Sequence, residues 1–202
     1  MNKFTQSVNG VALEFFTSNS LFSPGGIDKG TLFMIKCAEI TMANGVHNFD
    51  CSQSDYILDM GCGYGAVGIY FAKILSPQNV VMSDIDAKAV ALATKNAELN
   101  GVCGIKIIES DGFKNLAMSG FAHIFSNPPY HADFSIPKHF IEKGFNRLKL
   151  GGKMHMVTKR NDWYKNKLTA IFGGVKILRQ DGYYVFQAEK RQANYANRYR
   201  RN

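Results

Sequence analysis

Three absences narrow the class of protein that this 202-residue sequence can encode. No stretch approaches the roughly 18 consecutive apolar residues that a membrane helix needs. The first residues lack the apolar core of a signal peptide. The four cysteines form no Cys-x-x-Cys pair, which argues against a zinc site and against a disulfide framework. We therefore expect one cytoplasmic globular domain with reduced thiols, no metal and no membrane contact.

Basic residues are scarce in the first two thirds of the chain and abundant in the last third. Residues 1–137 contain 8 Lys and Arg against 12 Asp and Glu, whereas residues 138–202 contain 16 against 4. Such an imbalance favours a polyanionic partner, because cationic side chains release counterions from phosphates. The tail over residues 191–202 mixes cations with two tyrosines, a combination suited to RNA. A solvated basic face and a frayed terminus are the plainer alternatives.

Strand and helix patterns alternate along most of the chain. A hairpin is expected over residues 3–17 with Asn9-Gly10 as its turn, followed by a helix over residues 28–43. Further strands are predicted at 56–60, 79–83, 105–109, 122–126, 153–158, 175–180 and 183–189, and further helices at 65–75, 86–100, 137–150 and 162–172. Alternating βα units predict a doubly wound α/β domain: a mostly parallel, seven-stranded sheet that ends in an antiparallel hairpin.

A glycine-rich turn, Asp59-Met60-Gly61-Cys62-Gly63-Tyr64-Gly65, separates the strand at 56–60 from its helix. Glycines allow a sharp turn and a close approach to a ligand, and the helix that follows favours negative charge at its start. Gly63 to Gly68 also match the Gly-x-Gly-x-x-Gly dinucleotide fingerprint, and Asp84 ends the next strand, where a ribose would bind. A nicotinamide-dependent oxidoreductase is therefore one alternative on these residues.

The segment Asn127-Pro128-Pro129-Tyr130 follows the fourth predicted strand of the sheet, at the edge where open α/β sheets bind ligands. Two successive prolines fix φ and remove two N–H donors. The Asn127 side-chain oxygen and the Pro128 carbonyl are then the acceptors that could hold one planar –NH₂ group, with Tyr130 stacked on it. This arrangement suits transfer to an amine nitrogen. Taken alone, the segment also fits a simple turn.

Asp59 to Gly65, Asp84, Asp111 and Asn127 to Tyr130, in this order, resemble the class I S-adenosylmethionine (SAM) dependent methyltransferases that methylate nitrogen. The stretch from Thr17 to Thr31 further resembles the methyltransferase small-domain family, which includes bacterial rRNA guanine-N2 methyltransferases. The resemblance implies a Rossmann-like class I fold, SAM as cofactor and direct methyl transfer without a metal ion.

The resemblance also implies roles for individual residues. The cofactor-binding set is Phe22, Asp28, Thr31, Asp59, Gly61, Gly63, Gly65, Asp84, Asp111, Gly112, Phe113 and Asn127. The catalytic set is Asn127, Pro128, Pro129 and Tyr130, which would hold the target nitrogen. Asp59 would lie near the SAM amino group, Asp84 at the ribose and Asp111 at the adenine. His131 and Asp133 are candidates for accepting the released proton.

The function that these features favour is methylation of RNA, most specifically at guanine N2 of rRNA. Tyr130 stands where guanine-specific members often have phenylalanine, so adenine-N6 methylation of RNA or DNA and glutamine-N5 methylation of a protein are alternatives. A non-catalytic RNA-binding relative is a further one. Related rRNA enzymes commonly contain two copies of this domain. We expect a hairpin and pocket-closing loop over residues 1–27, the methyltransferase domain over 28–190 and a basic tail over 191–202.

Overall fold

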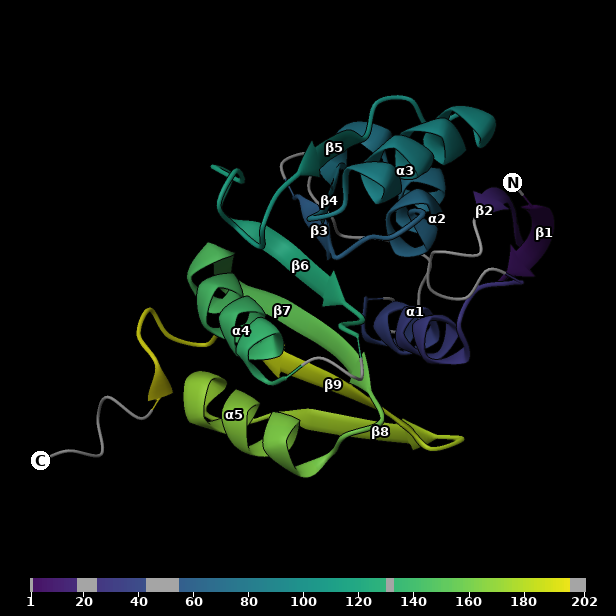
Figure 1. Cartoon of the computed structure of the whole chain (residues 1–202). Helices are drawn as coiled ribbons and strands as arrows, with labels where there is room; N and C mark the ends of the chain where they lie inside the picture. The colour runs from purple at the N-terminus through teal and green to yellow at the C-terminus, as the bar shows by residue number, and fades with distance from the viewer. Residues whose placement is uncertain (1, 18–24, 43–54, 130–132, 197–202) are drawn as a thin grey trace, which may run out of the picture.

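The computed structural model describes residues 2–17, 25–42, 55–129 and 133–196, without the side chains of residues 39–42 (Figure 1). The strands are β1 (Asn2–Val8), β2 (Val11–Thr17), β3 (Ile57–Met60), β4 (Val80–Asp84), β5 (Lys106–Glu109), β6 (Phe121–Ser126), β7 (Leu148–Thr158), β8 (Lys176–Gln180) and β9 (Tyr183–Glu189). The helices are α1 (Lys29–Met42), α2 (Ala66–Ile74), α3 (Ala87–Leu99), α4 (Ser135–Arg147) and α5 (Asp162–Phe172), with a 3₁₀ turn at Pro77–Asn79. Over these ranges, no helix combines the length and apolar character needed to span a bilayer.

Seven strands form one mixed sheet in the order β5-β4-β3-β6-β7-β9-β8. β3 to β7 are parallel, whereas β9 pairs antiparallel with both β7 and β8. Helices α1, α2 and α3 cover one face, and α4 and α5 cover the other (Figure 1). These layers confirm the doubly wound α/β fold. Because the carboxyl ends of the parallel strands share one edge, the segments that follow β3, β4 and β6 lie close together.

Strand β7 begins earlier than the sequence indicates. The apolar pattern predicts a helix that continues to residue 150, but α4 ends before Leu148, whose backbone is extended and pairs with Phe121 of β6. Gly151, at a φ of +78°, donates its N–H to the Lys190 carbonyl oxygen at 2.8 Å. The predicted helix over residues 148–150 is therefore wrong, because pairing with a neighbouring strand outweighs local periodicity.

His123 and His155 form a buried pair in the core. His123 Nδ1 lies 3.0 Å from His155 Nε2, and the Phe125 ring stacks on that of His155 with centroids 4.6 Å apart. Burial lowers the pKa of His123 to about 4 and holds the pKa of His155 well below its usual value. Both rings are therefore neutral near pH 7 and have a structural role in the core.

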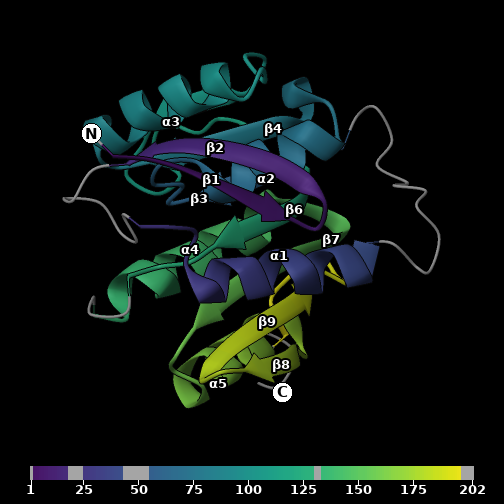
Figure 2. The same cartoon turned by 90° about the vertical axis from the view of Figure 1, so that its right-hand side faces the viewer.

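The β1–β2 hairpin lies against α2 and α3 and covers the turn after β3 (Figure 2). Positive φ values of +49° at Asn9 and +84° at Gly10 confirm the turn predicted there. The rings of Phe4 and Phe15 pack against Tyr64 of the glycine-rich turn, with centroids 6.1 and 5.3 Å away. The hairpin thus supports the glycine-rich turn from outside.

Asn96 of α3 joins the hairpin to that turn. Its fully buried side chain accepts a hydrogen bond from the Phe16 N–H at 2.8 Å and donates to the carbonyl oxygens of Phe16 and Tyr64 at 3.0 and 2.9 Å. One turn later, Asn100 bonds both backbone groups of Glu14. An amide side chain carries both a donor and an acceptor. The asparagines of α3 therefore provide hydrogen-bond partners for backbone groups at the edge of β2, where another strand would otherwise pair.

We expect Asn96→Ala to lower the free energy of unfolding by about 2 kcal/mol, because three backbone groups lose a buried partner. Urea denaturation measures this loss. Thr94→Ala, on the exposed side of α3, is the matched control and should stay within about 0.5 kcal/mol of the wild type. Equal stability of the two variants would contradict the role given to Asn96.

Candidate functional site

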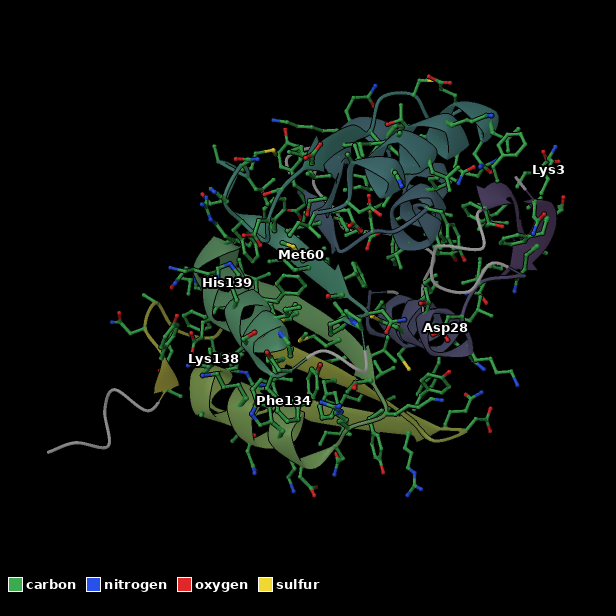
Figure 3. All side chains as sticks on the ribbon, in the orientation of Figure 1. Lys3, Asp28, Met60, Phe134, Lys138 and His139 are labelled. Atoms are coloured by element: carbon green, nitrogen blue, oxygen red, sulfur yellow. The ribbon has the colours of Figure 1, made fainter. Side chains whose placement is uncertain are left out.

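A cavity of about 340 Å³ opens at the carboxyl edge of the sheet, a size that suits a small ligand. It is bordered by the glycine-rich turn, the ends of β4 and β5, the Asn127 segment and the start of α1. Figure 3 labels Met60, the last residue of β3, and Asp28, which directly precedes α1; both residues line the cavity. Over the part of the chain that the structure describes, no cluster of three or more His, Cys, Asp or Glu could hold a metal ion.

The glycine-rich turn is held by hydrogen bonds within the protein. Gly61, Gly63 and Gly65 have φ values of +71°, +56° and +96°, a region that L side chains rarely adopt. The N–H groups of Gly61 and Cys62 both donate to the Ser83 carbonyl oxygen, and the Gly63 N–H donates to Asp84 Oδ2 at 2.8 Å. Because these amides already have acceptors, they do not form the free cradle that a pyrophosphate needs.

Two carboxylates are fixed against this turn. Asp59 is buried at the end of β3, and its Oδ2 accepts the Gly68 N–H at 2.9 Å. Burial raises the pKa of Asp59 to about 7; the Gly68 hydrogen bond opposes this shift, and the charge of Asp84 adds to it. Asp84 accepts from Gly63 through one oxygen and from the Asp86 N–H through the other, at 3.0 Å. A cationic group in the cavity would favour the ionised form of Asp59.

Asn127 has one fixed orientation. Its Nδ2 donates to Thr31 Oγ1 at 2.9 Å and to Asp28 Oδ2 at 3.2 Å. A carboxylate only accepts hydrogen bonds, so Asp28 requires the NH₂ end of the amide to face it. The other end, Asn127 Oδ1, is buried and has no hydrogen-bond partner among the residues that the structure describes. An unpaired buried acceptor at the border of a cavity is a site for a ligand donor.

Asp28 is itself held from both ends of the chain. Its Oδ2 accepts the Thr31 N–H at 3.1 Å, and its Oδ1 accepts the hydroxyl of Tyr183, the first residue of β9, also at 3.1 Å. Gly30 allows this approach, because a Cβ there would lie 2.5 Å from the Tyr183 ring. Sequence reasoning missed Tyr183, and no local pattern marks it. Only the pairing of α1 with the terminal hairpin brings the two residues together.

Most of the residues predicted to form the site border the cavity. They are Asp28, Thr31, Asp59, Gly61, Gly63, Asp84, Asp111, Gly112, Asn127, Pro128 and Pro129. Gly65 and Phe113 are buried and do not border it. Phe22, Tyr130 and His131 lie outside the described residues. The cavity also includes Ile85, Ile136 and Phe140, apolar side chains that the sequence did not single out.

Asp133 does not reach the cavity in the described structure. It is exposed, and its Oδ1 accepts the Ser135 N–H at the start of α4. Hydrogen bonds from Ser135 lower the pKa of Asp133, which makes its carboxylate a weaker base. The proposed role of Asp133 as a proton acceptor gains no support from this arrangement.

The charge of the cavity distinguishes between SAM and a nicotinamide dinucleotide, the two cofactors that the sequence allows. Its described lining contains Asp28, Asp59, Asp84, Asp86 and Asp111, and no Lys, Arg or His. Five carboxyl groups disfavour the two negative charges of a pyrophosphate and favour a cationic ligand such as SAM, which carries a sulfonium and an ammonium group. The orphaned Asn127 oxygen and the open volume also fit a methyl donor with an amine acceptor. The residues therefore fit SAM and not a dinucleotide.

Comparison with known proteins agrees with this geometry. The family model described as methyltransferase small domain matches residues 12–187. The uncharacterised protein YbxB of Bacillus subtilis is 33% identical over 181 residues, which cover 87% of this chain and 85% of that protein. Ribosomal RNA small subunit methyltransferase C of Pseudoalteromonas atlantica is 35% identical over 164 residues, covering 78% of this chain and 43% of that one.

A solved structure resembles most of the chain. It is the T. thermophilus 16S rRNA N2 methyltransferase RsmC in complex with AdoMet (SAM) and guanosine, with a TM-score of 0.82 and 25% identity. The match covers 94% of this chain and 50% of RsmC. The chain thus spans about half the length of the rRNA methyltransferases that it resembles.

The pKa of Asp59 gives a prediction for cofactor binding. The resemblance implies that Asp59 lies near the SAM ammonium, which would pair only with the ionised carboxylate. We therefore expect the dissociation constant of SAM to rise about tenfold per pH unit below about pH 7 and to level off above it. Calorimetry between pH 5.5 and 8 measures this dependence. Asp59→Asn should bind SAM more weakly at pH 8 and lose the dependence. If the dissociation constant of SAM depends on pH in the same way in wild type and Asp59→Asn, Asp59 is not the group that causes the dependence.

Proposed function

Because this chain belongs to the methyltransferase small-domain family and is a SAM-dependent methyltransferase, we propose that it methylates an exocyclic amino nitrogen of RNA, most specifically guanine N2 of ribosomal RNA. The observation that carries this proposal is the fixed amide of Asn127, whose buried oxygen has no hydrogen-bond partner in the described part of the chain. A donor from the substrate would complete it. The planar –NH₂ group of a nucleobase has the two N–H bonds that Asn127 Oδ1 and the Pro128 carbonyl can accept.

Alignment is the main contribution of these residues to the reaction. With both N–H bonds held by Asn127 and Pro128, the nitrogen lone pair is directed along one line into the cavity. SAM, when bound, supplies the methyl group as an electrophile on its sulfonium. The nitrogen becomes positive as it is methylated, and the Asn127 oxygen faces that charge. Asp28, bonded to the other end of the same amide, adds negative charge nearby, and water can take the released proton.

The choice of guanine in rRNA rests on the relatives. The rRNA small subunit methyltransferases C match most of this chain, and the RsmC structure contains guanosine. The fixed Asn127 amide would also accept the N6 amine of adenine or the side-chain amide of glutamine, so the test must identify the methylated group. An rRNA substrate would place the protein in the cytoplasm.

The test uses tritiated SAM with protein-free 16S rRNA and with assembled small subunits, followed by nucleoside mass spectrometry. We expect N2-methylguanosine. Label found as N6-methyladenosine would correct the base, and label found only on protein would overturn the RNA assignment. Purified bacterial release factor, added in a parallel reaction, supplies the glutamine substrate for that comparison.

In the same assay, Asn127→Ala should lower kcat by about 10²- to 10³-fold, because one of the two acceptors for the amine is lost. Its dissociation constant for SAM should remain within about threefold of the wild type. Asn166→Ala, an exposed asparagine on α5, is the control and should retain full activity. A large loss of SAM affinity in Asn127→Ala would instead make Asn127 a cofactor ligand.

Asp28→Asn tests the orientation of the Asn127 amide. An asparagine at position 28 can accept or donate, so the amide of Asn127 is no longer held one way, and the negative charge is lost. We expect kcat to fall by about 10- to 100-fold, the equivalent of one charge-assisted hydrogen bond, with an unchanged melting temperature. Asp181→Asn, in the exposed β8–β9 turn, is the control. If both variants retain wild-type kcat, Asp28 has no such role.

A further inference from the structure

Three cations lie over aromatic rings at the edge of the sheet that carries the cavity. Lys159 Nζ is 4.9 Å from the centre of the Tyr183 ring. The Arg160 guanidinium is 4.9 Å from the centre of the Phe134 ring, and that of Arg179 is 5.4 Å from the Tyr184 ring. All three cationic side chains belong to exposed residues. We call these three pairs the cation–ring row.

The row begins next to the proposed target site. Lys159 and Arg160 directly follow β7, the neighbour of β6, and Asn127 directly follows β6. Tyr183 carries the hydroxyl that bonds Asp28. Figure 3 shows Phe134 between α4 and α5, where its ring stacks on Trp163 with centroids 4.4 Å apart.

The row and the cofactor residues occupy different halves of the same edge. The glycine-rich turn, Asp84 and Asp111 follow β3, β4 and β5, at one end of the strand order. The cations of the row lie just after β7 and near the end of β8, toward the other end of the strand order. A substrate that reaches Asn127 opposite the cofactor therefore has the row beside it, and Asp28 is the carboxylate of the cavity lining that joins Asn127 to the row.

Resting on the proposed function, we propose that the single-stranded RNA flanking the target nucleotide lies along the cation–ring row. A base whose amine reaches Asn127 must leave its stack, so its neighbours are drawn to the protein surface as an unpaired strand. Lys159, Arg160 and Arg179 bind the phosphates of that strand. Each ring holds its cation in place before binding, which reduces the entropy lost on binding, and Trp163, half-buried against Phe134, offers apolar surface to a base.

Acidic residues at this edge interrupt the positive charge of the cation–ring row. Asp162 and Asp181 are exposed beside Arg160 and Arg179 in sequence, so the row is not a continuous positive band. Binding therefore depends on individual phosphate contacts, and each lost cation should reduce the salt dependence by a countable step.

The described part of the basic tail lies at the opposite edge. Glu189, the last residue of β9, pairs with Lys153 in the first half of β7, and the chain leaves the sheet there. Tyr195 then donates its hydroxyl to the Glu142 carbonyl oxygen on α4 at 2.9 Å. Figure 1 shows the described end of the chain, up to residue 196, near α4 and at the end of the sheet opposite the β8–β9 turn. Where it is described, the basic last third of the chain thus contributes two separate surfaces, of which the row adjoins the cavity and the residues of the tail up to 196 do not.

Arg160→Gln, Arg179→Gln and Arg191→Gln test the proposal. Arg191 is exposed at the opposite edge, near Glu189, and is the matched control. The probe is a fluorescein-labelled fragment of 16S rRNA, with affinity measured by anisotropy from 50 to 300 mM KCl. We expect each row variant to lose about three- to tenfold in RNA affinity and about one in the slope of log K against log salt. Arg191→Gln should match the wild type.

Methyl transfer gives the second readout. The row variants should raise KM for rRNA while kcat, the dissociation constant of SAM and the melting temperature stay unchanged, because no row cation borders the cavity. A double variant, Arg160→Glu with Arg179→Glu, should abolish RNA binding at 150 mM KCl.

Two failures are distinguishable. If wild-type protein labels no RNA and binds none, the proposed function fails, and this inference fails with it. If wild-type protein labels rRNA but the row variants behave as Arg191→Gln does, the proposed function stands and the row is not the RNA path. Loss of RNA affinity in Arg191→Gln alone would place the RNA on the tail side and overturn the inference.

Discussion

The amide of Asn127, held by Asp28 and Thr31, is the constraint on which the site depends. Because Asp28 can only accept, the amide presents its oxygen to the cavity, and no described residue forms a hydrogen bond with that oxygen. The bond also ties the start of α1 to the end of β6. Tyr183 holds Asp28 from the terminal hairpin, so three distant parts of the chain must be in place before the acceptor is oriented.

Charge divides the functional edge of the sheet into two parts. The described cavity lining is acidic, and its buried Asp59 has a pKa near 7 that a cationic cofactor would lower. The adjoining row of cations over rings is suited to phosphates. A cationic methyl donor and the proposed polyanionic substrate would thus each meet the opposite charge. The net charge of +8 hides this separation, because it sums both parts with the tail.

Other parts of the protein support the glycine-rich turn from outside. Asn96 and Asn100 of α3 satisfy the edge of β2, and the hairpin in turn packs its rings on Tyr64. This support lies within residues 12–187, the part that matches the methyltransferase small domain, apart from β1 and the first residue of β2.

Local sequence determined the order of the strands and helices and the conformation of the glycine-rich turn. Positive φ at Gly61, Gly63 and Asn9-Gly10 follows from residue type, and alternating periodicities predict the order of strands and helices. Tertiary structure decided what depends on distant pairing: where β7 begins, that Phe113 belongs to the core, and that Tyr183 reaches Asp28 across 155 positions of sequence. The Asn127 motif could be recognised in the sequence. The direction of its amide could not, because Asp28, an acceptor distant in sequence, sets that direction.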